Sequence, residues 1–348
     1  MSKADREMEG LDYPFQEPPL PATIKKVADG VFWLRMPMPF SLDHINLWML
    51  ESQDGWTLVD TGLATDETVE NWQKIYQTYA NNLPVKQVIV THMHPDHIGL
   101  AGWITRRSGA QLLMSRADYL YCHHLLCYSH TDAPEHALQF YRSVGFSEEQ
   151  IDLYQAQFGG FGKFIRALPH SFMQLKDNTE LTIGNNKWRV ILGYGHSTEH
   201  VCLYCEEKNI FISGDQVLPT ISSNISVHPT EPNANPLEEW LASCHHLAEQ
   251  LNNNTLVLPA HGMPFIGAPK RLLDMSRQTE ADLSKLLIFC QEPRSVIDAF
   301  PILFKSTITR HNLIMATGES LAHFNCLLER GLIKRLKGAE GIYRYQRI

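Results

Sequence analysis

The run His92-Met93-His94-Pro95-Asp96-His97 places three imidazoles and a carboxylate within six residues. It follows the apolar run Val85-Lys86-Gln87-Val88-Ile89-Val90, which predicts a buried strand. Imidazole nitrogens and carboxylate oxygens are the ligands that zinc and similar divalent metals prefer. Burying four such groups unpaired would cost free energy, and at this density they cannot all point to one ion. The run therefore predicts a loop that supplies ligands to two adjacent metal ions.

Three further candidate ligands also follow strand-like runs, at 188–192, 209–213 and 256–258. They are His196 in Gly195-His196-Ser197-Thr198-Glu199-His200, Asp215 in Ser213-Gly214-Asp215-Gln216 and His261 in Pro259-Ala260-His261-Gly262. A rigid sheet that carries functional side chains on loops at its strand ends is a common arrangement. The separate segments together predict one site for two metals. Histidines outside these motifs are interpreted as ordinary core or surface residues: His123, His130, His170 and His245.

The order of segments predicts an α/β fold. Strand-like runs at 31–34, 45–50 and 56–60 precede a helical segment around 72–79. Residues 1–22, which are rich in proline, are expected to form an extended arm.

Residues 115–172 interrupt the strand pattern and are rich in aromatic residues and histidine. They are predicted to form a helical insertion that covers one side of the site, with a flexible stretch at Phe158-Gly159-Gly160-Phe161-Gly162. From about residue 270 the pattern changes to helices, predicted at 271–292, 295–300 and 319–330, and then to a β-hairpin at 331–345. Residues 23–268 are thus expected to be the catalytic domain and residues 269–348 a winged-helix domain.

The composition is that of an ordinary globular protein, with 44% hydrophobic and 20% charged residues. A net charge of −8 argues against bulk electrostatic attraction to nucleic acid or to an anionic membrane. The first residues lack the apolar core of a secretion signal, and no run approaches the roughly 18–20 apolar residues of a membrane span. Seven scattered cysteines, with Cys202 and Cys205 on a predicted buried strand, indicate a reducing, cytoplasmic setting.

The ordered set of motifs resembles the metallo-β-lactamase superfamily over roughly residues 25–267. The early turn Val59-Asp60-Thr61-Gly62 also matches that family. The resemblance implies an αββα sandwich, in which two β-sheets face each other, helices lie outside and the metals sit at one edge. Gly195–Val201 and Gly214–Pro219 resemble the branch of the family that carries a C-terminal winged helix.

The resemblance also implies a role for each candidate ligand. The first metal would be held by His92, His94 and His196, and the second by Asp96, His97 and His261. Asp215 would bridge the two ions, and Asp60 would orient a ligand histidine. Zinc is the expected ion, and iron or manganese would suit the same ligands. Tyr194 either polarises a substrate carbonyl or packs at a strand end, and His200 is expected to make a structural hydrogen bond.

A water that bridges two such ions becomes a nucleophile near neutral pH and would attack a carbonyl. The favoured substrate is a thioester of the acyl-CoA or glutathione type, or a related ester. Asp215 stands where zinc β-lactamases commonly carry a cysteine, so antibiotic hydrolysis is not favoured.

Lactone hydrolysis and cleavage of single-stranded RNA stay open as alternatives. Residues 294–348 hold nine Lys or Arg residues against four acidic ones, and this tail could hold a nucleic-acid backbone or the phosphates of CoA. A small-molecule substrate is preferred to a nucleic acid, no membrane partner is expected, and formation of a homodimer is left open.

Overall fold

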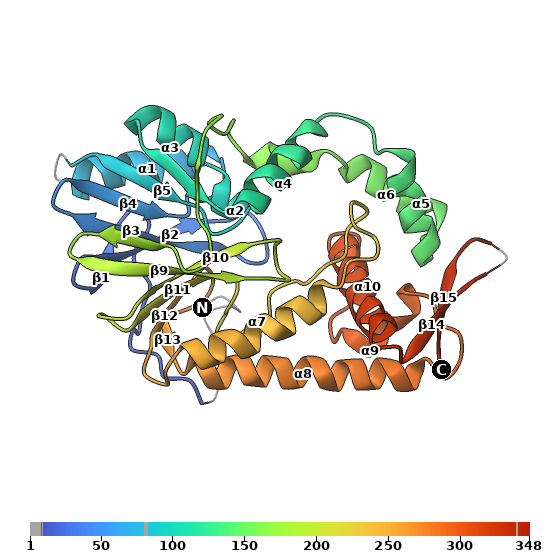
Figure 1. Ribbon diagram of the computed structural model, residues 1–348. Coiled ribbons are helices and arrows are strands. Elements are labelled where there is room, and N and C mark those ends of the chain that lie inside the picture. Colours follow the sequence, from blue (N-terminus) through green and yellow to red (C-terminus); the bar gives the residue numbers. More distant parts are fainter. Residues whose placement is uncertain (1–7, 9, 80–82, 339) are drawn as a thin grey trace.

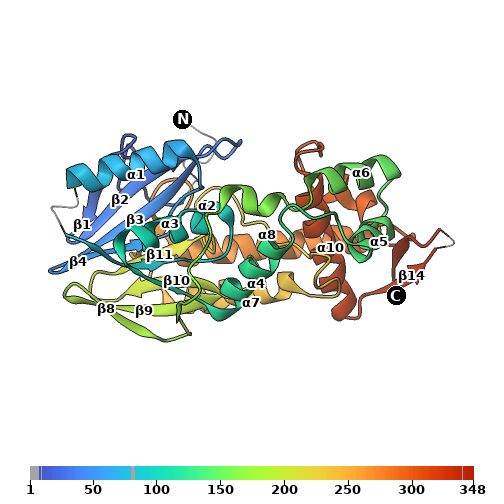
Figure 2. The ribbon, with the colours of Figure 1, turned by 90° about the horizontal axis from the view of Figure 1, so that it is seen from above.

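The computed structural model describes residues 8, 10–79, 83–338 and 340–348 (Figure 1). Two β-sheets pack face to face, with helices on their outer faces (Figures 1 and 2). The strand order is β1-β2-β3-β4-β5-β6-β7 in one sheet and β13-β12-β11-β10-β9-β8 in the other. Both sheets combine antiparallel and parallel pairs. The α/β class and the predicted sandwich are confirmed.

The first sheet begins as an antiparallel meander and continues with parallel strands. Its strands are β1 (Lys25–Ala28), β2 (Val31–Pro37), β3 (His44–Ser52), β4 (Gly55–Val59), β5 (Val85–Ile89), β6 (Gln111–Met114) and β7 (Met173–Gln174). Helix α1 (Asp66–Tyr79) connects β4 to β5, and α2 (Pro95–Ile98) and α3 (Ala101–Ser108) connect β5 to β6. Such crossovers make the strands parallel, so β4 and β5 end at the same edge of the sheet.

The second sheet delivers the later candidate ligands to that edge. Its strands are β8 (Glu180–Ile183), β9 (Asn186–Gly193), β10 (His200–Cys205), β11 (Ile210–Gly214), β12 (Leu256–Pro259) and β13 (Phe265–Ile266). Helix α7 (Pro236–Gln250) crosses between the parallel strands β11 and β12. Cys202 and Cys205 lie fully buried on β10, as predicted, and all seven cysteines are free.

Tryptophans fill the space between the sheets. Trp33 and Trp48 stack with their ring centroids 6.0 Å apart, and both are almost fully buried. The indole nitrogen of Trp33 donates to Oδ1 of Asn46, whose amide nitrogen donates in turn to the carbonyls of Pro259 and Gly262. The core is thereby tied to the turn that carries His261.

The predicted insertion is helical and contains α4 (Arg116–Cys127), α5 (Glu135–Val144), α6 (Glu148–Gln157) and the short η2 (Gly160–Phe164). Helices α5 and α6 lie against the C-terminal helices, away from the sheets (Figures 1 and 2). A Cβ on Gly145 would lie 3.1 Å from Cδ1 of Ile297. Gly159 has a φ of +70°, and a Cβ there would lie 2.7 Å from the Tyr128 carbonyl oxygen, so the glycine stretch serves close backbone packing.

The C-terminal part contains α8 (Ala268–Phe289), η3 (Ile297–Ala299), α9 (Phe300–Leu303), α10 (Leu313–Glu329), β14 (Ile333–Lys337) and β15 (Tyr343–Arg347). Helices followed by a hairpin match the predicted order, and the winged-helix assignment stays a prediction. The predicted start of α10 at residue 319 is wrong, because the helix begins at Leu313 and includes Thr317 and Gly318. Both residues have low helix propensity, and both are buried, so tertiary packing outweighs local preference.

Part of the N-terminal arm pairs with the second sheet, because Asp12 forms an antiparallel bridge with Ile266. The expectation for residues 1–7 and 9 lies outside the described residues. Within the described chain, every helix is too short or too polar to cross a bilayer.

Candidate metal centre

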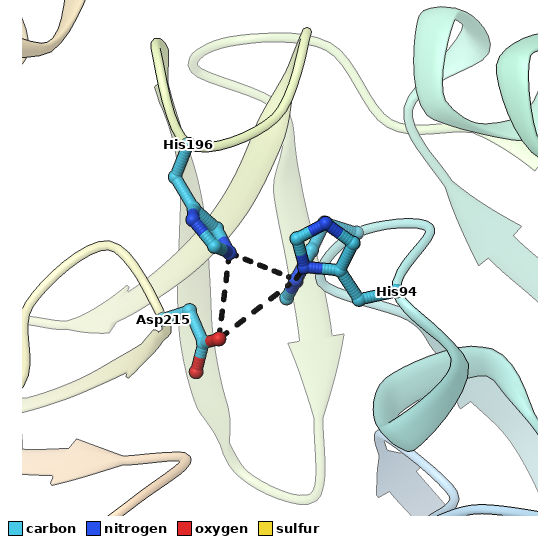
Figure 3. A group of neighbouring side chains, drawn as sticks. His94, His196 and Asp215 are labelled. Atoms are coloured by element: carbon cyan, nitrogen blue, oxygen red, sulfur yellow. Dashed lines mark hydrogen bonds and ion pairs between the residues drawn. The ribbon is translucent and has the colours of Figure 1, made fainter. Parts of the chain in front are cut away.

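All the predicted ligands meet at the edge where strands of both sheets end. His92, His94, Asp96 and His97 follow β5, while His196, Asp215 and His261 follow β9, β11 and β12. They form two groups, within each of which the potential ligand atoms lie within 4.8 Å of one another: His92, His94, His196 and Asp215, and Asp96, His97 and His261. His94, His196 and Asp215 point toward one another from three separate loops (Figure 3). The structure therefore brings together the predicted set.

Asp215 faces both groups with its two carboxylate oxygens. Its Oδ2 lies 3.4 Å from Nε2 of His196, and its Oδ1 lies 3.3 Å from Nε2 of His261. Asp96 belongs to the second group only, with Oδ2 3.3 Å from Nε2 of His261 and 3.4 Å from Nε2 of His97. This is the placement that a bridging Asp215 requires.

A change of backbone conformation divides the ligands on the first loop. His94 is extended, and Pro95 begins the short helix α2 at the position where proline is best tolerated. The amides of His97 and Ile98 both donate to the His94 carbonyl, which turns the chain. His92 and His94 consequently face His196, while Asp96 and His97 face His261.

Hydrogen bonds on the outer side of two rings determine which nitrogen faces the site. Nδ1 of His196 lies 2.8 Å from the Asn224 carbonyl oxygen, and Nδ1 of His261 lies 2.8 Å from the His44 carbonyl oxygen. A carbonyl only accepts, so each Nδ1 carries the proton and each Nε2 presents a lone pair.

Asp60 and Thr91 impose the same orientation on two more rings. Asp60 Oδ2 accepts from Nδ1 of His97 at 2.7 Å and from the Thr91 hydroxyl at 2.9 Å. The Thr91 oxygen is then free to accept from Nδ1 of His92 at 3.0 Å. The lone pairs on Nε2 of His92 and His196 face each other across 3.2 Å, an arrangement that a cation between them would stabilise.

Two orphaned atoms show that the site fits metal ions. Nε2 of His97 and Oδ1 of Asp215 are buried, with no hydrogen-bond partner among the described residues, whereas buried polar atoms are normally paired. Ligand atoms about 2.0–2.2 Å from a tetrahedral zinc lie roughly 3.3–3.6 Å apart. Two separations in the first group, 2.9 Å between His92 and His94 and 4.0 Å between His92 and Asp215, lie on either side of that value.

Burial and charge set the protonation of the site in the absence of a cation. Burial lowers the pKa of His94 to about 3, and the neighbouring imidazole of His196 contributes to the shift. Burial opposes a charge on His97 too, but the carboxylates of Asp96, Asp60 and Asp215 outweigh it and raise its pKa well above the usual range. The same negative charge attracts a divalent cation, whose binding would release that proton.

Asp118 on α4 belongs to the site and was missed in the sequence. It is fully buried, and its carboxylate accepts from the amides of Met93 (3.0 Å) and Glu199 (2.8 Å) and from the Ser197 hydroxyl (3.2 Å). It thus ties the loop of His92 to the loop of His196. The pattern Ser115-Arg116-Ala117-Asp118 is recognisable as a helix start, and Ser115 does cap α4. Nothing in that local pattern indicates the distant contacts.

The structure shows the hydrogen bond expected of His200, whereas the role of Tyr194 stays a prediction. His200 makes the expected structural hydrogen bond, since its Nε2 accepts from the Asp215 amide at 3.1 Å, and its ring stacks on His92 at 4.7 Å. Tyr194 is 39% exposed and lines a cavity beside His196, so its catalytic role stays a prediction. Within the described chain, neither metal-compatible group includes the histidines interpreted as ordinary: His123, His130, His170 and His245.

Two cavities lie beside the first group of ligands. The aromatic chamber, of about 310 Å³, is lined by Met93, His94, Tyr121, Tyr141, Phe158 and Ile314 among others. In the described chain, its lining includes no Asp, Glu, Lys or Arg side chain. The polar cavity, of about 620 Å³, is lined by His196 and three glutamates, Glu199, Glu231 and Glu239. A 3.0 Å hydrogen bond between the hydroxyls of Tyr121 and Thr230, which line both spaces, crosses between them.

Replacing Asp60 by asparagine tests how the ligands are oriented. Asparagine keeps the shape of the side chain and tolerates the positive φ of 63°, but it removes the charge that holds the proton on Nδ1 of His97. We expect metal affinity to fall about 10- to 100-fold in a competition assay with a chelator. Asp54→Asn, an exposed carboxylate on the β3–β4 turn, is the control. Equal affinities of Asp60→Asn and the wild type would refute the orienting role.

Comparisons with known proteins agree with this architecture. The family profile described as "Metallo-beta-lactamase superfamily" matches residues 41–261, and the profile described as "Metallo-beta-lactamase-like, C-terminal domain" matches residues 283–348. A beta-lactamase domain protein from Burkholderia ambifaria has a crystal structure that superposes with a TM-score of 0.90. It is 36% identical, and the match covers 97% of this chain and 98% of that one.

Curated relatives are more distant. The probable metallo-hydrolase YqjP of Bacillus subtilis (strain 168) is 22% identical, and the match covers 86% of this chain and 92% of that protein. The human acyl-coenzyme A thioesterase MBLAC2 is 21% identical, and the match covers 69% of this chain and 81% of that protein.

Proposed function

Because the chain belongs to the metallo-beta-lactamase superfamily, we propose that it is a dinuclear metal-dependent hydrolase that cleaves thioesters or related esters of apolar acyl groups. The choice of an apolar acyl group rests on one observation. The aromatic chamber is lined in part by His94, which belongs to the first group of candidate ligands. The similarity to a named acyl-coenzyme A thioesterase supports the same choice.

In this proposal His92, His94 and His196 would hold one metal, Asp96, His97 and His261 would hold the other, and Asp215 would contribute to both. Zinc suits these nitrogen and oxygen donors, as do iron and manganese. Two bound ions would supply activation of a water molecule and polarisation of the substrate carbonyl. Asp60, Thr91 and the carbonyls of His44 and Asn224 would keep the imidazoles aimed at the metals. Tyr194, at the polar cavity, would be free to approach the substrate.

The aromatic chamber suits the acyl part of the substrate. Tyr141 and Phe158, like the other aromatic side chains of the insertion, offer large apolar surfaces, and burying an acyl chain against them is favourable by about 0.8 kcal/mol for each methylene group. The same contacts would exclude bulk water from the reacting carbonyl. Lactones are cyclic esters, so the proposed hydrolysis of esters includes them.

Cleavage of single-stranded RNA is less well supported. Glu199, Glu231 and Glu239 line the polar cavity, where their charges would repel a phosphate backbone and would equally repel the phosphates of CoA. The basic hairpin β14–β15 lies at the opposite end of the molecule from the sandwich (Figures 1 and 2). The helix-and-hairpin order of residues 268–347 supports the winged-helix interpretation, but a wing so placed would not hold RNA at the metals.

The test is to load the protein with zinc, iron or manganese, to measure metal content by elemental analysis, and to assay thioesters and single-stranded RNA in parallel. Octanoyl and acetyl esters of CoA, glutathione and pantetheine vary the acyl group and the charge of the thiol separately. We expect about two metals per chain and a preference for octanoyl over acetyl groups. RNA cleavage without thioester turnover would reverse the proposal.

Gly160→Leu tests the aromatic chamber as the acyl site. Gly160 lines the chamber, and a Cβ there would have only Cε of Lys163 within 4.0 Å, so a side chain can start at this position without a backbone clash. Displacing two or three methylene groups of the substrate should lower kcat/KM for the octanoyl thioester about 15- to 60-fold. The acetyl thioester, which does not fill the chamber, is the internal control and should keep its rate. An equal loss for both substrates would contradict this assignment.

A further inference from the structure

The segment between β11 and α7, residues 215–235, contributes to every part of the proposed site. We call it the Asp215 loop. It carries the bridging Asp215, the carbonyl of Asn224 that orients His196, and His228 and Thr230 on the walls of both cavities. It contains no helix or strand, so other parts of the chain must hold its conformation.

The first half of the Asp215 loop is held by α8. Arg271 is 6% exposed and donates through Nε to the Leu218 carbonyl and through Nη2 to the Ile221 carbonyl, both at 2.8 Å. A buried guanidinium that satisfies two loop carbonyls fixes this stretch close to Asp215.

Helix α10 holds the middle of the loop. The Val227 amide donates to the Gly318 carbonyl at 3.1 Å. A Cβ on Gly318 would lie 2.7 Å from Cβ of Ser226, so a glycine here lets the helix touch the loop. Farther along the Asp215 loop, the side-chain amide nitrogen of Asn325 donates to the carbonyls of Pro232 and Ala234.

One chain of contacts links α10 to a metal ligand. Oε2 of Glu319 accepts from Nδ2 of Asn224 at 2.9 Å, and Oδ1 of Asn224 accepts from the Ser226 hydroxyl at 2.6 Å. The side chain of Asn224 is therefore held at both ends of its amide. Its backbone carbonyl, held in place by these bonds, accepts from Nδ1 of His196 at 2.8 Å.

We propose that α10 positions His196 through Asn224, and that Glu319 is a positioning residue of the metal centre. The C-terminal domain is then part of the framework of the site. The inference rests on the proposed metal-dependent function, and it identifies what the domain contributes to that function.

The environment of Glu319 fits a role as hydrogen-bond acceptor. Burial raises its pKa to about 7, although the hydrogen bond from Asn224 acts in the opposite direction. A carboxyl group in such a place is unfavourable unless its acceptor oxygen is used. Glutamine offers the same acceptor without the charge, so Glu319→Gln should preserve the function that Glu319→Ala removes.

The chain offers a matched control. Glu329, also on α10, accepts from the side-chain amide of Asn235 at 2.9 Å, the same kind of contact at the far end of the Asp215 loop. Glu329→Ala removes a hydrogen bond between helix and loop but leaves the partner of His196 in place.

The experiment measures zinc affinity by chelator competition, together with kcat, KM and thermal unfolding, in the full-length chain. We expect Glu319→Ala to weaken binding of the first zinc about 10- to 100-fold and to lower kcat while KM holds. Glu319→Gln and Glu329→Ala should both stay close to the wild type. If Glu319→Ala does not fold, Asn224→Ser removes the same hydrogen bond from the other side, together with the one from Ser226.

The results of this experiment distinguish a failure of the positioning role of Glu319 from a failure of the proposed metal-dependent function. Wild-type zinc affinity in Glu319→Ala, or an equal loss in Glu319→Ala and Glu329→Ala, would overturn the positioning role and leave the metal-dependent function standing. A wild-type chain that binds no zinc, iron or manganese would overturn that function itself. The double variant Glu319→Ala/Asn224→Ser should lose no more affinity than Asn224→Ser alone, because Glu319 acts on His196 only through the side chain of Asn224.

Discussion

Asp215→Asn is expected to lower kcat/KM for a thioester about 1000-fold or more and to reduce bound metal below two ions per chain. The carboxylate of Asp215 faces His196 with one oxygen and His261 with the other, so the substitution removes the negative charge shared by both groups. The charge stabilisation that such ions supply amounts to several kcal/mol, and each 1.4 kcal/mol is about tenfold in rate. Steady-state kinetics and elemental analysis of the same preparation measure both effects.

The fold should survive this substitution. The backbone amide of Asp215, which donates to His200, is unchanged, and asparagine keeps the volume of the side chain. Asp54→Asn provides a control with the same chemistry at an exposed turn and should match the wild type. Two bound metals and full turnover in Asp215→Asn would remove the bridging carboxylate from the mechanism.

Asp118→Ala is expected to destabilise the protein by roughly 3–5 kcal/mol, and metal binding should fall with it. The substitution leaves the buried amides of Met93 and Glu199 and the Ser197 hydroxyl without their acceptor. Each such orphaned donor costs about 1–3 kcal/mol. The loops of His92 and His196 would also lose their common anchor.

Denaturant unfolding of the metal-free protein measures the stability change without a contribution from the ions. Asp66→Ala is the matched control, because Asp66 lies in the first turn of α1 with an exposed side chain, where its loss should cost no more than about 1 kcal/mol. A change below that value in Asp118→Ala would show that Asp118 does not anchor the two loops.

The ligands of the proposed metal centre could be read from the sequence because their chemistry is local. His92, His94, Asp96 and His97 crowd onto one loop after an apolar strand, and burial leaves such a cluster few uses other than metal binding. The division of this loop between two groups is also local in origin, because Pro95 starts a helical turn between His94 and Asp96.

The partners of those ligands could not be predicted in the same way. Asp118 approaches Met93 and Glu199, and Glu319 approaches Asn224, only because elements far apart in the sequence pack together. The packing of α5 and α6 on the C-terminal helices, which walls the aromatic chamber, has the same origin.

The sequence by itself therefore determined the α/β class and the set of candidate metal ligands, since strand periodicity and ligand spacing act over a few residues, while the sandwich followed from the family resemblance. Tertiary structure alone decided which distant partners hold those side chains, what shape the aromatic chamber takes, and where α10 begins. Gly318 shows the reason, because it is unfavourable in an isolated helix, yet it lets α10 contact the Asp215 loop at Ser226. Contacts of this kind depend on the whole packed chain, and no local pattern contains them.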